Sequence, residues 1–208
     1  MHSVPRFLMV ACLAAVSTSS ALSAQGDDPD WPCIQRKVPE LSIGQIWTGS
    51  DLLPQAKDWS QDEGVSKLVD DLAARRLPLA EAKEKINAYR DTLPTDQRPP
   101  HIAMLIQGLF DKMNGERSHV ISGIARYAHR QRDLAASLRR EGSALDAMRV
   151  RSDADQNQVT LRSEQLLLQT RIFQERVQSL TYVCEVPTLI EQRLYALVRM
   201  LAEAPPAQ

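Results

Sequence analysis

Aromatic residues and glycine are scarce in this sequence. Aromatics make up 5% of the chain, and glycine occurs eight times. Strands are enriched in aromatic residues and sheet turns in glycine, so both shortages favour an α-helical chain over a β-sandwich or a barrel. Beyond the first 24 residues, no apolar run reaches the roughly 20 residues that a membrane-spanning helix requires.

Motifs of catalysis, haem attachment and phosphate binding are missing as well. The chain has no Gly-x-Ser-x-Gly, no Ser-x-x-Lys, no Cys-x-x-Cys-His and no glycine-rich phosphate loop. Its net charge of −1 argues against a strong electrostatic attraction to nucleic acid or an anionic membrane. We therefore predict no catalytic residue, no metal site, no cofactor and no nucleic-acid partner.

The first 24 residues have the order of a secretory signal peptide. Arg6 precedes an apolar stretch over residues 7–16, and small residues and then acids follow it. The apolar stretch is too short to span a bilayer as a stable helix. We predict that residues 1–24 are removed on export, with cleavage after residue 21, 23 or 24, and that the mature protein is periplasmic or secreted.

Removal of the leader takes Cys12 with it and leaves Cys33 and Cys184. Two cysteines in an oxidising compartment indicate one disulfide. The alternative is two free thiols, with Cys184 acting as a small apolar residue of a helix core. A bridge would close a loop over most of the mature chain, with a stabilising effect of at most roughly 5 kcal/mol.

Residues 25–60 are rich in proline, glycine, aspartate and serine, and they hold all three tryptophans. Four prolines exclude a long helix here, so we predict an irregular arm that lies on the rest of the protein. Residues 41–47 alternate between apolar and polar side chains and predict a short extended segment. Trp31 and Trp47 either cover an apolar end of the helical part or form a binding patch, since tryptophan is a common interface anchor.

The remaining residues, 61–208, are predicted to form a helical bundle domain. Two short helices are expected within residues 62–93, because apolar residues recur there at helical spacing. Pro78 suits the first turn of the second helix, and Pro94 stops it.

A heptad repeat covers residues 100–150. Its two sets of seam positions start at Phe110 and Met113 and continue in steps of seven, and nine of the twelve positions are apolar. This spacing is typical of coiled coils. Asn114-Gly115 is the weak point at which the helix could kink or split.

A second long helix is expected over residues 154–204, antiparallel to the first. The residues that recur at intervals of seven are Val159, Leu166, Phe173 and Leu180. The residues that widen the apolar face beyond a two-stranded seam are Leu161, Leu168 and Ile172. We expect Pro187 to interrupt this helix and Thr188-Leu-Ile-Glu191 to cap a last one. A second copy of the chain could also use the seam, because heptads do not show whether the partner helix is intramolecular.

Arginines are concentrated on the first long helix. Residues 115–151 carry eight arginines against four acids, whereas residues 152–208 carry five against seven. The arginines that form the stripe are Arg126, Arg130, Arg132, Arg139, Arg140 and Arg149. They could bind lipid head groups or an acidic protein. Alternatively, they pair across the hairpin with Glu164, Glu175 and Asp155.

Two weak patterns point to a metal or a haem. Glu116-Arg-Ser-His119 matches an element that di-metal carboxylate bundles contain twice, but it occurs here once. Met104 or Met113 could ligate a non-covalent haem together with His119, although methionines at core spacing usually fill the core.

The expected fold is therefore all-α: a long antiparallel coiled-coil-like hairpin, two shorter packed helices and an irregular N-terminal arm. The expected function is that of an exported interaction or scaffold module for a protein partner. The possible interaction surface is formed by Trp31, Trp47, Arg126, Arg130, Arg139 and Arg140. A ligand-, haem- or metal-binding bundle is the second hypothesis, and a cell-envelope enzyme without a recognisable motif is the third.

Overall fold

A computed structural model describes residues 28–49, 51–52 and 54–203 of the chain. Its elements are α1 (Ile43–Ile46), the 3-10 helix η1 (Pro54–Gln61), α2 (Glu63–Ala73), α3 (Leu79–Thr92), α4 (Arg98–Arg149) and α5 (Gln156–Ala202). The described residues contain no strand, so the all-α prediction is confirmed. The predicted signal peptide, residues 1–24, lies outside the described residues.

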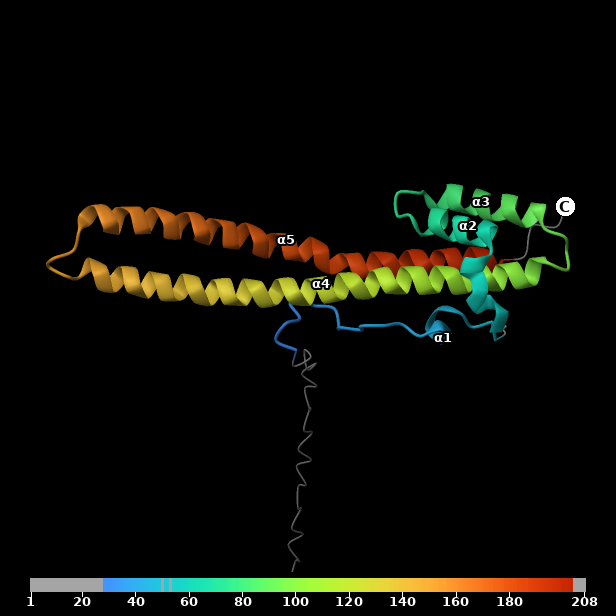
Figure 1. Cartoon of the computed structure of the whole chain (residues 1–208), viewed down its shortest axis with the longest axis horizontal. Helices are drawn as coiled ribbons and strands as arrows, with labels where there is room; N and C mark the ends of the chain where they lie inside the picture. Colours follow the sequence, from blue (N-terminus) through green and yellow to red (C-terminus); the bar gives the residue numbers. More distant parts are fainter. Residues whose placement is uncertain (1–27, 50, 53, 204–208) are drawn as a thin grey trace, which may run out of the picture.

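A long antiparallel hairpin of α4 and α5 dominates the molecule (Figure 1). The helix α4 has 52 residues and α5 has 47, which correspond to lengths of about 80 and 70 Å. Two prolines in the first turn start α4 at Arg98, slightly earlier than the sequence indicated. Asp155 caps α5 by accepting hydrogen bonds from the backbone N–H groups of Asn157 and Gln158.

The predicted seam packs α4 against α5 of the same chain. Met113, Ile124 and Leu145 are buried along it, as are the polar seam residues Arg117 and Gln131. In this structure, the chain's own α5 therefore occupies the seam. None of the helices in the described ranges combines the length and apolarity needed to cross a membrane.

The expected interruption of α5 at Pro187 is wrong, because the helix continues through this residue. Proline removes one backbone hydrogen bond from a helix interior and costs about 3 kcal/mol there, but its fixed φ suits the helix. Pro187 is itself buried, and Cys184 and Ile190 are buried on either side of it. We infer that this packing outweighs the missing hydrogen bond.

The weak point at Asn114-Gly115 does not break α4 either. The Asn114 side chain reaches out of the helix, accepts a hydrogen bond from the Leu41 N–H at 3.0 Å and donates one to the Leu41 carbonyl at 3.4 Å. The asparagine therefore holds the arm against α4.

The predicted extended segment at residues 41–47 is also wrong, because a single helical turn, α1, forms there. Ser42 and Gln45 form a capping box, in which the Gln45 side chain accepts a hydrogen bond from the Ser42 N–H at 2.8 Å. This local pairing satisfies backbone groups that an isolated strand would leave without a neighbour.

The main core lies at the open end of the hairpin, where α2 and α3 cover one side and the arm with α1 lies on the other (Figure 1). The two short helices confirm the prediction for residues 62–93. Arg90 donates hydrogen bonds to the carbonyls of Met200 and Leu201, and Arg193 donates to the carbonyl of Leu72 at 2.8 Å. Burial lowers the pKa of both guanidinium groups. These bonds join α3 and α2 to α5.

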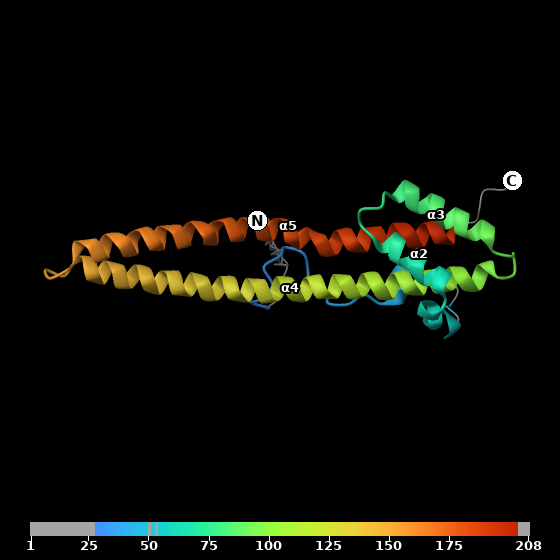
Figure 2. The same ribbon diagram turned by 45° about the horizontal axis from the view of Figure 1, so that its top comes forward.

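The half of the hairpin near the α4–α5 loop has no covering helix, as Figures 1 and 2 both show. Several of its seam side chains are only partly buried, namely Leu134, Leu138, Leu166 and Phe173, whereas Ile124, Gln131 and Leu145 are buried. We call this part the bare half and define it as residues 120–183.

We predict that the core end contributes more to stability than the bare half. Leu109→Ala should lower the free energy of unfolding by about 2–5 kcal/mol, because this side chain is fully buried. Leu134→Ala should cost about 1 kcal/mol, because its side chain is already partly exposed. Urea unfolding followed by circular dichroism measures both values, and equal losses would contradict this distribution.

Candidate functional site

A disulfide joins Cys33 to Cys184 across 151 residues, which confirms the predicted pairing. Both half-cystines are buried in a small cluster with Ile124, and Trp31 and Val120 pack against it. The bridge ties the N-terminal arm to α5 near the middle of the hairpin.

From the disulfide, the arm follows the surface of α4 in both directions. His129 and Arg132 contact the Asp30 carboxylate on one side of the bridge. On the other side, Arg117 donates a hydrogen bond to the Val38 carbonyl at 2.7 Å, and Ser118 donates one to the Pro39 carbonyl. Polar side chains of α4 thus satisfy the backbone of a segment with no regular structure of its own.

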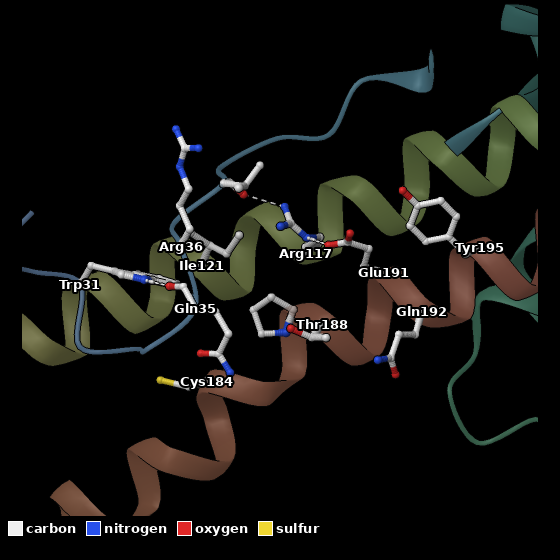
Figure 3. A pocket seen from close by; sticks show the side chains of 12 residues that line it. Trp31, Gln35, Arg36, Arg117, Ile121, Cys184, Thr188, Glu191, Gln192 and Tyr195 are labelled. Carbon is white, nitrogen blue, oxygen red and sulfur yellow. Dashed lines mark hydrogen bonds and ion pairs between the residues drawn. The ribbon is translucent and has the colours of Figure 1, made fainter. Parts of the chain in front are cut away.

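A cavity of about 340 Å³ lies between the arm and the hairpin (Figure 3). Trp31 and Tyr195 line it together with Arg117 and Glu191. Arg117 is almost fully buried, and its Nε atom lies 3.4 Å from Glu191 Oε2. The Trp31 indole N–H donates to the Gln35 carbonyl at 2.6 Å. Arg117 therefore both pairs with Glu191 and holds the arm through the Val38 carbonyl.

A second cavity, of about 510 Å³, opens on the hairpin itself, and we call it the groove. Val120, Gly123, Ile124 and Tyr127 line it from α4, and Ser179, Leu180 and Val183 line it from α5. A Cβ atom at Gly123 would meet only the Arg126 guanidinium, at 4.0 Å. Because glycine has no side chain, position 123 leaves space at the groove, and the Arg126 guanidinium lies beside this space.

Exposed apolar side chains gather on α5. Of twelve large apolar residues exposed within the described ranges, nine belong to this helix: Leu161, Leu167, Leu168, Ile172, Val177, Tyr182, Val183, Leu189 and Tyr195. Leu161, Leu168 and Tyr182 are 64%, 60% and 75% exposed. Leu161, Leu168 and Ile172 share one helical face, because their spacings are seven and four residues. They form an apolar face that none of the described residues covers.

Most of the predicted arginine stripe has no internal partner. Arg132 contacts Asp30, and Arg149 pairs with Asp146. Within the described part of the chain, no hydrogen bond or ion pair involves the side chains of the other four: Arg126, Arg130, Arg139 and Arg140. The expected pairing across the hairpin is wrong for these four, because Glu175 pairs with Arg171 and Asp155 caps α5.

The two tryptophans of the predicted interaction surface lie apart. Trp31 is next to the disulfide, whereas Trp47 packs against the main core at the open end. They therefore do not form one patch with each other.

The residues considered for metal or haem binding do not converge. Glu116 pairs with Arg75 at 3.3 Å, and His119 is exposed. Met113 lies in the main core, and Met104 packs against it. Within the described ranges, no group of three or more histidine, cysteine or acidic side chains is placed to hold a metal ion.

The groove is not predicted by the sequence. Three of its lining residues lie beside the seam positions: Gly123, Ser179 and Val183. The heptad pattern therefore does not include them. Small residues beside a seam are a usable signal, but the two that meet here are 56 positions apart in the chain. No family model, no curated protein and no solved structure matches this sequence.

We predict that the disulfide holds the arm and stabilises the fold. The double variant Cys33→Ser/Cys184→Ser should lose at most roughly 5 kcal/mol, because the bridge closes a loop of 151 residues. Trypsin should then cut the arm at Arg36 or Lys37 while the helical circular-dichroism signal persists. Unchanged urea midpoints together with an uncut arm would contradict this role.

Proposed function

We propose that this protein is an exported helical interaction module that binds a partner protein through the bare half of its hairpin. The observation that carries this proposal is the uncovered apolar face on α5, represented by Leu161, Leu168 and Tyr182. Large exposed apolar surfaces are typical of interaction sites, because leaving them in water is unfavourable. The leader-like order of residues 1–24 supports a periplasmic or secreted location.

The distribution of stabilising contacts supports the same function. The helices α2 and α3 and most of the arm pack at the open end, where the main core lies. The bare half extends about 40 Å beyond the disulfide, as the rise of α4 from Ile124 to Arg149 gives. This projection adds little to the core, but it offers a long two-helix surface to another molecule.

The two other hypotheses gain no support from the described residues. A cofactor-binding bundle would need ligands that meet in the interior, and the seam there is filled with side chains. For a cell-envelope enzyme, the charged pair in the cavity beside the arm is already engaged, because Arg117 pairs with Glu191 and also donates a hydrogen bond to the arm.

We predict that a photocrosslinker on the bare half captures a protein partner from the cell envelope. The variant Tyr182→p-benzoylphenylalanine should give a discrete adduct, because this side chain is 75% exposed on the apolar face. Adding Leu168→Glu should reduce the adduct about tenfold, which corresponds to about 1.4 kcal/mol of binding free energy. Gel mobility and mass spectrometry identify the adduct.

The matched control carries the crosslinker at Glu84, which is exposed on α3 at the opposite end of the molecule. The same adducts from both positions, or adducts from the α3 position alone, would refute the proposed function. Circular dichroism confirms that the labelled variants are folded.

A further inference from the structure

We infer that the groove between α4 and α5 binds an amphipathic helix with acidic flanks that belongs to another protein. This inference rests on the proposed function and adds the chemistry of the partner. Its two supports are the shape and apolarity of the groove and the unpaired arginines beside it.

The groove suits the apolar face of a helix. Val120 and Tyr127 line it seven residues apart on α4, which gives a length of about 10 Å, or two helical turns. Apolar side chains at i, i+3 or i+4, and i+7 of a partner helix occupy such a length. Gly123 and Ser179 leave the space that the partner's side chains would fill.

The arginines beside the groove have no ion-pair partner among the described residues. The Arg126 guanidinium lies 4.0 Å from the Cβ position of Gly123. Arg130 follows one turn later on α4, and Arg176 precedes Ser179 by three residues on α5, so it lies on the same side of that helix. In the described part of the chain, none of these three side chains has a hydrogen bond or an ion pair. Acidic residues on both flanks of a bound helix would complement them.

The charge balance disfavours a second copy of the chain as the occupant. Within the bare half as described, five arginines lack a partner: Arg126, Arg130, Arg139, Arg140 and Arg176. Among the described acidic residues of the bare half, Glu164 alone lacks a partner. A second copy would bring the same positive excess to the interface and would leave the arginines unpaired.

An anionic membrane would satisfy the arginines but not the groove. The groove is a hollow between two helices. A bilayer presents a broad surface, which would contact the edges of the groove and leave its interior unfilled. An apolar hollow with unpaired arginines beside it matches an acidic amphipathic helix better than either alternative.

The test uses the mature, disulfide-bonded protein and three labelled 14-residue helical peptides. The first has leucine at i, i+4, i+7 and i+11 and glutamate on both flanks. The second replaces each glutamate with lysine, and the third replaces each leucine with serine. Fluorescence anisotropy should show binding of the first peptide at least tenfold tighter than that of the other two.

Two sets of protein variants locate the peptide. Arg126→Glu/Arg130→Glu and Val183→Glu should each weaken binding at least tenfold. The control Arg76→Glu/Arg199→Glu changes the net charge equally at two exposed arginines of the core end and should alter the dissociation constant less than twofold. Arg199 lies 16 residues beyond Val183, about 24 Å along α5.

Equal binding of all three peptides, or no binding by any of them, would overturn the inference. A dimer in light scattering that Val183→Glu converts to a monomer would identify a second copy as the occupant. Arginine-dependent binding to phosphatidylglycerol vesicles without peptide binding would identify a membrane. If the crosslink from position 182 persists in any of these cases, the interaction module stands and the acidic helix alone is rejected.

Discussion

The packing of α4 against α5 along the heptad seam determines where the other described elements can lie. At the core end, α2 and α3 pack on the hairpin, and the arm lies along one side of α4. Without the seam, neither short helix has a surface large enough to bury its apolar face. Arg117 and Gln131 occupy seam positions in the buried interior, where polar residues favour one register over others.

The hairpin is stabilised unequally along its length, and this difference links the fold to its proposed function. At the open end, several layers cover the seam, and residues such as Leu109 and Leu194 are almost fully buried. Beyond the disulfide, two helices alone share the seam, and several seam residues, such as Leu134 and Phe173, are only partly buried. A region whose apolar groups are incompletely buried gains stability when another molecule covers it.

Much of this arrangement was predictable, but the candidate site was predictable only in part. The apolar widening at Leu161, Leu168 and Ile172 and the excess of arginine on α4 are both visible in the sequence. The sequence does not show which arginines stay unpaired. For example, Arg132 pairs with Asp30 of the arm, which is about 100 residues away in the chain. Likewise, Asn114-Gly115 predicts a weak point of the helix, and only the fold brings the Leu41 backbone within hydrogen-bond distance of Asn114.

The sequence by itself determined the helical class, the two long helices and their seam. With Cys33 and Cys184 as the two cysteines outside the predicted signal peptide, it also determined the disulfide pairing. These properties depend on the local spacing of apolar residues or on the number of cysteines. The tertiary structure alone decided that α5 continues through Pro187, that the arm lies along α4, and that Gly123 and Ser179 meet at the groove. Each of these depends on contacts between residues far apart in the chain, whose energies outweigh local preferences.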